Sequence, residues 1–522
     1  MNRLVITACA LFLAGGLLPA LELPNFFSDH MVVQRDRPIV IWGTAKPGAG
    51  VTVNFKGKTR DTTAGEDGAW RVELPKEKAS AGGRDLTVTS GGETRTISDV
   101  LVGEVWFASG QSNMAWPVSR THEADADIAR ARYPAIRMFL ADLTPARDPQ
   151  SDIGGSWQVC TPENVPRWSA AAYFFALPLH KELGVPVGII RSAWGGKPVE
   201  TFTSREALAA IPEGKAMLAG LDAAIADYDP EAAAANHAAA LEKWEKRLAA
   251  HKERKQAGKE VGRPPRKPAL AKDPAVTEGK PGVLYNGMIH PFVGYPMRGA
   301  IWYQGESNAN HGTAHIYRKL FSTMITDWRK RWDDEFSFLW VQLANFRQPA
   351  NEPGAVDSWA LLQDEQRRTL ALPKTGMAVA NDIGAADDIH PRNKKEVGRR
   401  LALWALKHDY GMDVVAHGPL YKRHTIDGDK VIITFDYAEG LKTRDGGFVQ
   451  RIEIAGKDRV WHWADAEIKG NTLVVSSPAV PAPVAARYAW CSNPQGANLV
   501  NQAGLPASVF RTDDWPHEEN SP

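Results

Sequence analysis

The feature that most constrains this 522-residue chain is a series of near-continuous apolar segments separated by amphipathic stretches. Such segments have the composition of strands that are buried on both faces of a sheet. Residues 170–183, 317–332 and 396–405 instead place apolar side chains at helical spacing, so each predicts a helix with one buried face. This alternation predicts a parallel α/β sheet covered by helices. The predicted strands are residues 102–107, 187–190, 297–303, 338–342 and 377–380.

The chain is too long for one compact core, and its sequence pattern changes along its length. Before about residue 100 and after residue 411, short strand-like segments alternate with turn signals such as Asp427-Gly428, which predicts β-rich modules. Residues 205–280 interrupt the α/β pattern with an Ala-, Glu- and Lys-rich stretch. We interpret them as a solvated helical excursion, with a lid or a docking arm as the alternative. The predicted parts are a signal segment at 1–20, a β-sandwich-like module at 21–99, an α/β domain at 100–410 and a β-rich module at 411–522.

The first twenty residues have the pattern of an export signal. Arg3 supplies the positive start, residues 4–18 form an apolar run, and Ala20 offers a small residue for cleavage. The sequence therefore predicts a periplasmic or extracellular protein with no membrane partner once the signal is removed. Lipidation at Cys9 is the less favoured alternative, because the apolar run continues well past that residue.

Composition narrows the range of partners. The formal net charge of +1 gives no reason to expect nucleic acid or an anionic membrane as a partner. The 18 Trp residues are many for this length. Because Trp is both a large core residue and a platform for sugar rings, we expect most of them in the core and a few in a carbohydrate cleft.

Metal and disulfide chemistry have little support in the sequence. Outside the signal segment only Cys160 and Cys491 remain, which could pair in an oxidising compartment or stay as two buried thiols. His311 and His315 have a spacing found in zinc sites, but Gly312 stands where a zinc protease carries its glutamate. We therefore expect no metal there.

Ser112 lies just after the predicted strand 102–107, in the turn Gly-Gln-Ser-Asn-Met of residues 110–114. The carboxyl ends of parallel strands are where α/β folds bind ligands, and a helix that starts there points backbone N–H groups at a developing oxyanion. Taken alone, a serine after glycine is usually only a turn residue. The stretch also differs from the Gly-x-Ser-x-Gly elbow of α/β-hydrolases, because Met114 occupies the last position.

A base for that serine is available further along the chain. A serine hydroxyl is a poor nucleophile near neutral pH and needs a general base, which in turn needs an orienting carboxylate. Asp387 and His390, in the stretch Asp-Asp-Ile-His-Pro, follow the predicted strand 377–380. An Asp three residues before a His can fold back onto one imidazole nitrogen and leave the other to face the serine. Taken alone, such neighbours are mostly surface residues.

Two further polar loops follow predicted strands. Residues 302–308, Trp-Tyr-Gln-Gly-Glu-Ser-Asn, carry amide side chains of the kind that stabilise an oxyanion, although the loop could instead bond only to its own backbone. Residues 192–196, Ser-Ala-Trp-Gly-Gly, contain glycines that let a backbone N–H approach a ligand closely. Four such loops after α/β strands favour one shared site.

These four motifs resemble those of the sialate O-acetylesterase family, which belongs to the SGNH hydrolase superfamily. The likeness also covers the opening at residues 23–34 and the tail at residues 487–507. The resemblance implies a three-layer SGNH-hydrolase α/β fold with a flavodoxin-like parallel sheet, flanked by N-terminal and C-terminal β-rich modules. It also implies a serine carboxylic-ester hydrolase that removes acetyl groups from an O-acetylated sugar or glycan and needs no metal or organic cofactor.

The resemblance assigns a role to each catalytic residue. It implies that Ser112 is the nucleophile and that His390 is the general base and later the acid. Asp387 would orient His390, because the family spacing is Asp-x-x-His, and the adjacent Asp388 is the alternative.

The resemblance also implies an oxyanion hole. Backbone N–H groups of Ser112 and of Gly195 or Gly196 would form part of it. Either Gln304 or Asn308 would complete it, and this choice stays open because the sequence departs here from the superfamily's usual Gly-x-Asn-Asp. Glu306 is expected to organise the same loop.

The motifs do not decide which sugar carries the acetyl group. We expect a sialate O-acetylesterase, with an acetylxylan or other polysaccharide acetylesterase as the alternative. An inactive carbohydrate-binding protein is the alternative from a different class, and the intact Ser112, Asp387 and His390 argue against it.

Overall fold

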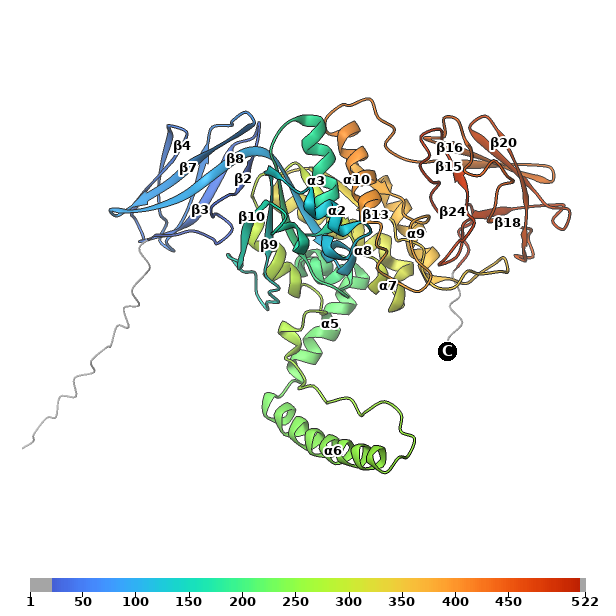
Figure 1. Cartoon of the computed structure of the whole chain (residues 1–522), viewed down its shortest axis with the longest axis horizontal. Helices are drawn as coiled ribbons and strands as arrows, with labels where there is room; N and C mark the ends of the chain where they lie inside the picture. The colour runs from blue at the N-terminus through green and yellow to red at the C-terminus, as the bar shows by residue number, and fades with distance from the viewer. Residues whose placement is uncertain (1–20, 517–522) are drawn as a thin grey trace, which may run out of the picture.

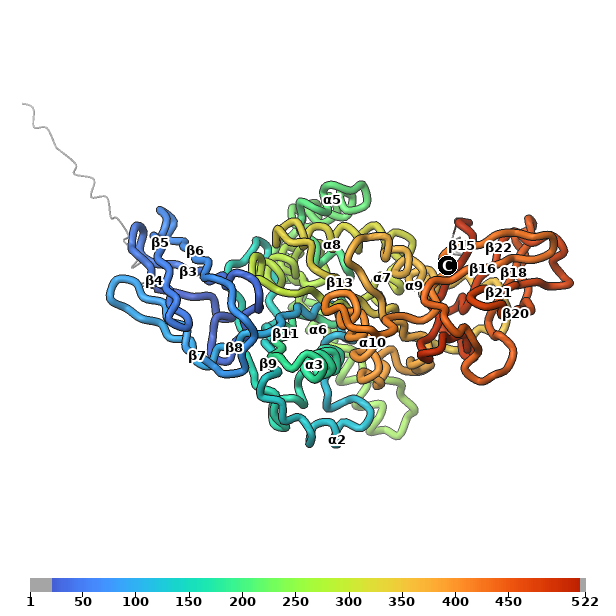
Figure 2. The backbone as a smooth tube through the Cα atoms, turned by 90° about the horizontal axis from the view of Figure 1, so that it is seen from above, coloured from blue at the N-terminus to red at the C-terminus, as the bar shows by residue number. Residues whose placement is uncertain are grey.

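The computed structural model describes residues 21–516, so the predicted signal segment at 1–20, with Cys9, lies outside the described residues. A central α/β part lies between two β-rich parts (Figure 1). Figure 2 shows the N-terminal and C-terminal strands at opposite ends of an elongated molecule. Among the residues described, none of the helices combines the length and the hydrophobicity that a membrane crossing requires.

The N-terminal strands lie in two sheets, a separate one of three strands and a second one that continues into the central sheet through one long strand. In one, β1, β3 and β6 pair antiparallel. In the other, β4 pairs with β5 and β7, while β7 and β2 pair with the first part of a long strand, β8. Burial alternates along β6, as expected for strands with one face in the core. Their bounds are β1 (Leu21–Glu22), β2 (Val32–Gln34), β3 (Ile39–Ala45), β4 (Gly50–Phe55), β5 (Lys58–Thr63), β6 (Ala69–Leu74) and β7 (Ser80–Ser90).

Strand β8 (Glu93–Gly110) joins the N-terminal and central parts as one strand of 18 residues. Its first part pairs antiparallel with β7, and its second part pairs parallel with β11 and β12. Every residue from 100 to 110 is buried, which explains the apolar run in the sequence. The expected boundary between residues 99 and 100 falls inside this strand, and the division of the chain into domains stays a prediction.

The central sheet has the order β10-β9-β11-β8-β12-β13-β14. All its neighbours pair parallel except β10, which pairs antiparallel with β9 at one edge, so the sheet is mixed. The five strands predicted from apolar runs are confirmed. The two strands at the β10 edge were not predicted, because Pro134 and Arg137 interrupt the apolar run of β9. The bounds are β9 (Tyr133–Ala141), β10 (Gly155–Cys160), β11 (Val187–Ala193), β12 (Gly299–Tyr303), β13 (Ser337–Val341) and β14 (Thr375–Ala378).

Helices cover both faces of this sheet. Trp106 and Phe107 are neighbours in β8 and therefore point to opposite faces. The ring of Trp106 lies 4.9 Å from that of Phe175 in α3, and the ring of Phe107 lies 5.6 Å from that of Trp328 in α8. Helix α10 packs beside α3 (Figure 1). The helices of this part are α1 (Ser112–Ala115), α2 (Ala124–Ala129), α3 (Ala170–Leu183), α7 (Glu306–Asn310), α8 (Tyr317–Trp332), α9 (Ser358–Arg368) and α10 (Lys394–His408).

The three predicted helices are confirmed, and local signals explain their ends. Helix α3 begins after Ser169, whose hydroxyl accepts a hydrogen bond from the backbone N–H of Ala172, and it ends at Gly184 in the left-handed conformation. Short turns of helix connect the larger elements. They are η1 (Val118–Arg120), η2 (Val165–Arg167), η3 (Val199–Phe202), η4 (Pro274–Val276), η5 (Tyr285–Ile289), η6 (His290–Phe292), η7 (Ala314–Ile316) and η8 (Thr369–Ala371).

Residues 205–280 contain the expected helices. They are α4 (Arg205–Ala209), α5 (Pro212–Ala226) and α6 (Pro230–Gln256). Helix α6 has no buried residue and lies away from the body of the molecule (Figure 1). The exposure of α6 agrees with a solvated helix, and the choice between an excursion, a lid and a docking arm stays a prediction.

The C-terminal strands form two four-stranded sheets and a two-stranded one, with the orders β15-β16-β21-β20, β19-β18-β22-β24 and β17-β23. The expected β-rich character of this part is confirmed. The bounds are β15 (Leu420–Asp427), β16 (Lys430–Asp436), β17 (Lys442–Thr443), β18 (Ile452–Ala455), β19 (Trp461–Trp463), β20 (Asp465–Lys469), β21 (Thr472–Ser476), β22 (Ala485–Tyr488), β23 (Leu499–Val500) and β24 (Phe510–Arg511).

The order of strands in the central sheet points to the carboxyl end of β8. In chain order β8 comes first. Strands β9 and β11 follow on one side of it, and β12, β13 and β14 then follow on the other side. The direction of winding therefore reverses at β8. In open α/β sheets such a reversal leaves a crevice outside the carboxyl ends of the strands, where ligands bind.

The packing on β8 predicts a large stability effect. We expect Phe107→Ala, which removes a fully buried ring, to lower the free energy of unfolding by about 3–5 kcal/mol. The matched control, Phe448→Ala, removes a ring that is 89% exposed, and it should change stability by less than about 0.5 kcal/mol. Denaturant unfolding followed by fluorescence measures both, and equal losses would contradict the proposed packing.

Candidate active site

Ser112 lies at the point where three parallel strands end together. Gly110 at the end of β8 is in register with Ala193 of β11 and Tyr303 of β12. A side chain at Gly110 is excluded, because its φ is 134° and a Cβ would lie 2.3 Å from the backbone oxygen of Tyr303. Two backbone hydrogen bonds fix the turn. The N–H of Gln111 donates to the oxygen of Tyr303 (3.0 Å), and the N–H of Trp194 donates to the oxygen of Gly110 (3.0 Å). Ser112 then starts α1.

His390 meets Ser112 from a segment 278 residues further along the chain. The Nε2 atom of His390 lies 2.8 Å from the Oγ atom of Ser112, which is hydrogen-bonding distance. The indole of Trp116 stacks on the imidazole, with ring centroids 4.7 Å apart and planes 14° apart. This stack restricts the orientation of the imidazole. Sequence reasoning did not single out Trp116.

The environment of His390 favours its neutral form. Burial lowers the pKa of His390 below its ordinary value, the carboxylate of Asp388 opposes this change, and the charges of Lys394 and Arg120 reinforce it. A neutral imidazole can accept a proton from a serine hydroxyl, whereas a protonated one cannot.

The structure favours Asp388 over Asp387 as the carboxylate that orients His390. The Oδ1 atom of Asp388 lies 3.7 Å from Nδ1 of His390. The same oxygen accepts a hydrogen bond from the backbone N–H of His390 (2.9 Å). This turn, in which an Asp side chain bonds two residues ahead, places the carboxylate on the imidazole side. Asp387 is exposed, and within residues 21–516 no hydrogen bond or ion pair joins it to His390. The geometry thus favours the alternative residue, and the assignment of Asp387 stays a prediction.

The glycines after β11 border Ser112. A Cβ on Gly195 would lie 3.2 Å from the Cβ of Ser112, so the backbone of this glycine packs directly against the serine. Gly196 has a φ of 69°, a conformation that favours glycine. No hydrogen bond from the backbone N–H of Ser112, Gly195 or Gly196 is found within residues 21–516. These donors are therefore available to a substrate oxygen.

Gln304 and Asn308 use their amide donors inside the protein. Gln304 Nε2 donates to the backbone oxygen of Lys197 (3.2 Å) and to Oδ1 of Asn308 (2.7 Å). Asn308 Nδ2 donates to Glu200 (3.0 Å) and to Thr313 (3.0 Å). Since each amide nitrogen has two hydrogens, neither has one left for an oxyanion. The geometry favours a role for both residues in holding the loop that follows β12.

Glu306 lies in a buried network that includes two residues missed by sequence reasoning, Asn113 and Lys394. Asn113 donates to Glu306 and to the backbone oxygen of Ile389, and it accepts from Lys394. This arrangement agrees with a loop-organising role for Glu306. The sequence held a weak signal for Lys394, a cation four residues after His390 in the first turn of a helix. Nothing in the sequence shows that its side chain is buried.

The other residues considered for chemistry lie apart from this network. Cys160 and Cys491 are free and buried, so the alternative of two separate thiols holds. Burial raises the pKa of each thiol to about 11. His311 and His315 are exposed, and within residues 21–516 no group of three or more His, Cys, Asp or Glu side chains could hold a metal ion.

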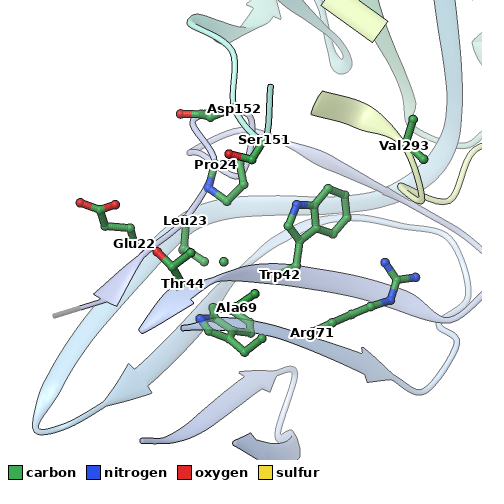
Figure 3. A pocket seen from close by; sticks show the side chains of 12 residues that line it. Glu22, Leu23, Pro24, Trp42, Thr44, Ala69, Arg71, Ser151, Asp152 and Val293 are labelled. Carbon is green, nitrogen blue, oxygen red and sulfur yellow. The ribbon is translucent and has the colours of Figure 1, made fainter. Parts of the chain in front are cut away.

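A cavity of about 530 Å³ lies between the N-terminal strands and the α/β part (Figure 3). The indole of Trp42 lies between Ser151 on one side and Arg71 on the other. None of the residues around Ser112 and His390 lines this cavity, so it is separate from the candidate active site.

Comparisons with known proteins agree with this geometry. A model of the family described as carbohydrate esterase, sialic acid-specific acetylesterase, matches residues 279–407. Sialate O-acetylesterase from Rattus norvegicus is 29% identical over 93% of this chain and 93% of its own length. The Homo sapiens sialate O-acetylesterase is 26% identical over 95% of this chain and 94% of its own.

A solved structure provides the decisive comparison. A carbohydrate acetylesterase from Xanthomonas citri is 37% identical in sequence, with a TM-score of 0.79. The match covers 95% of this chain and 100% of that one. The chain belongs to the sialate O-acetylesterase family. It is therefore an esterase, and the mixed α/β part with its added β-rich regions is the architecture that it shares with the Xanthomonas citri protein.

The packing of Gly195 against the serine predicts a loss of esterase activity without a loss of fold. In Gly195→Ala the new methyl group would displace Ser112 from His390, and a displacement of about 1 Å can cost roughly 100-fold in rate. Gly220→Ala is the matched control, because a Cβ at this position in α5 meets nothing within 4 Å. Hydrolysis of p-nitrophenyl acetate measures both variants, and full activity in Gly195→Ala would contradict the close approach.

Proposed function

We propose that this member of the sialate O-acetylesterase family hydrolyses acetyl esters on sugars through a Ser-His-Asp mechanism. Ser112 is the nucleophile, His390 is the general base, and Asp388 orients the base. The observation that carries the proposal is the 2.8 Å contact between His390 Nε2 and Ser112 Oγ. A serine hydroxyl needs such a partner to act as a nucleophile near neutral pH.

In the first half of the proposed reaction Ser112 Oγ attacks the acetyl carbonyl carbon and gives its proton to His390 Nε2. Backbone N–H groups of Ser112 and of Gly195 or Gly196 stabilise the resulting oxyanion. The ester bond to the sugar then breaks, and the sugar alcohol leaves with the proton from His390. Ser112 now carries the acetyl group.

In the second half a water molecule takes the place of the sugar alcohol. His390 removes a proton from the water, which attacks the acetyl carbonyl. The second tetrahedral intermediate collapses, Ser112 regains its proton from His390, and acetate leaves. The role of Asp388 is to stabilise the imidazolium that forms in both halves.

We also assign the central part to the three-layer SGNH-hydrolase fold. The support is that motif loops following β8, β11, β12 and β14 contain Ser112, Gly195, Glu306 and His390. The winding reversal at β8, which leaves a crevice at this edge, agrees with that assignment.

Sialate is the proposed sugar, because relatives that match over nearly the whole chain are named sialate O-acetylesterases. Acetylxylan is the second candidate, since the Xanthomonas citri relative is named only a carbohydrate acetylesterase. Acetate release from O-acetylated sialic acid and from acetylated xylan, measured side by side, distinguishes the two. Faster hydrolysis of the xylan would overturn the choice of sialate.

We further propose that residues 1–20 direct export, which would place the enzyme in the periplasm or outside the cell. The support is the pattern of a positive start, an apolar run and a small residue at position 20. Cell fractionation, together with sequencing of the mature N-terminus, tests this proposal. Retention of residues 1–20 on the mature chain would overturn it.

Removing the nucleophile should abolish activity. We expect Ser112→Ala to lower kcat by at least roughly a thousandfold, because it removes the hydroxyl that forms the proposed acyl intermediate. Ser119→Ala is the matched control, since Ser119 is exposed and lies seven residues away. Steady-state kinetics with p-nitrophenyl acetate compare the two variants, and wild-type activity in Ser112→Ala would refute the mechanism.

The two neighbouring aspartates should differ in effect. Asp388→Asn should lower kcat by about tenfold or more. It should also move the acid limb, the fall of kcat/KM at low pH as His390 becomes protonated, to lower pH. The reason is that the Asp388 carboxylate raises the pKa of His390. Asp387→Asn should leave kcat and the position of the acid limb unchanged. A pH profile of kcat/KM for each variant checks this, and a larger effect at Asp387 would restore the original assignment.

A further inference from the structure

Lys394, at the start of α10, is a buried cation that the mechanism above does not use. Its side chain is 0% exposed, and it donates a hydrogen bond to Oδ1 of Asn113. The amine also lies 4.9 Å from the centre of the Tyr303 ring. A buried lysine is costly to desolvate and persists only where the surroundings compensate for its charge.

Asn113 links this lysine to a buried carboxylate. The protonated amine of Lys394 can only donate, so Oδ1 of Asn113 faces Lys394 and Nδ2 of Asn113 faces Glu306. Asn113 is 1% exposed and Glu306 is 2% exposed. The amide therefore bridges the Lys394 amine and the Glu306 carboxyl group, which do not touch each other directly.

The amide of Asn113 also connects the Ser112 turn to the His390 loop. Asn113 directly follows Ser112 in the chain, and its Nδ2 also donates to the backbone oxygen of Ile389 (3.0 Å), the residue before His390. The orientation that Lys394 imposes on Asn113 is thus the one that holds the His390 loop beside Ser112.

The charges around His390 come from several elements. Asp388 lies in its own loop, Lys394 lies on α10 and Arg120 lies on η1. Glu306 and Asp388 face Lys394. Burial lowers the pKa of Lys394 to about 7, so below that pH, where His390 titrates, the lysine carries its charge.

We propose that Lys394 is a positioning residue of the esterase reaction, which acts through Asn113 to hold His390 at Ser112. This inference rests on the proposed roles of Ser112 and His390. The lysine does not touch the reacting atoms. It acts on the geometry and the protonation of the base.

The pH profile of kcat/KM tests this role. In Lys394→Met the cation and its hydrogen bond are lost, so we expect kcat to fall by roughly tenfold to a hundredfold while KM changes little. The acid limb should move to higher pH, because the lysine charge lowers the pKa of His390. This shift is opposite to the one expected for Asp388→Asn. A purely structural role would lower kcat without moving the limb.

Two further variants keep the test decisive. Lys394→Met leaves Glu306 without its opposite charge, so the double variant Lys394→Met/Glu306→Gln, which removes both charges and keeps an acceptor for Asn113, is measured beside it. Its acid limb should also lie at higher pH than that of the wild type. Lys395→Met is the matched control, because Lys395 is half exposed, pairs with Asp127 and does not act on His390.

The outcomes separate this inference from the proposed mechanism. An acid limb that moves upward in both Lys394 variants, with the control unchanged, supports the role of the lysine. An acid limb at the wild-type position in both variants overturns it. If Ser112→Ala is inactive in the same assay, the serine mechanism stands in either case, whereas an active Ser112→Ala would overturn the mechanism instead.

Discussion

Strand β8 is hydrogen-bonded to β11 on one edge and to β12 on the other, and this pairing determines where the active-site loops can lie. Because the three strands are parallel and in register at Gly110, the loops that follow them leave the sheet at the same place. Ser112, Gly195 and Glu306 come together for this reason, although nearly two hundred residues separate the first from the last. The His390 loop follows β14 at the far edge of the sheet, and Asn113 holds it at the serine through the backbone oxygen of Ile389.

The electrostatics of the site balance opposing effects. Burial and two nearby cations favour a neutral His390, while the carboxylate of Asp388 favours the charged form. For the proposed base, burial and the two cations favour the neutral form needed at rest, and Asp388 favours the charged form that arises during the reaction. The Lys394 amine is buried, so its charge, when the amine is protonated, acts on the imidazole with little screening by solvent.

Much of this arrangement could be predicted from the sequence, because apolar strands and helical periodicity report burial directly. The parallel strands β8, β11, β12, β13 and β14, helices α3, α8 and α10, and the loops that contain Ser112 and His390 followed from pattern alone. The exceptions depend on side-chain direction. Asp388 rather than Asp387 lies on the imidazole side because of a local turn, and the amide nitrogens of Gln304 and Asn308 donate to acceptors within the protein. A buried Lys394 has the same sequence appearance as an exposed one.

The central claim is that Ser112 is the residue that forms the acyl-enzyme. Labelling with a serine-directed fluorophosphonate, followed by peptide mapping, tests it most directly, because the reagent requires an activated serine. We expect one label per chain on Ser112 and a loss of esterase activity in proportion to the labelled fraction. Loss of activity with the label on another residue, or full labelling of Ser112 with activity retained, would contradict it.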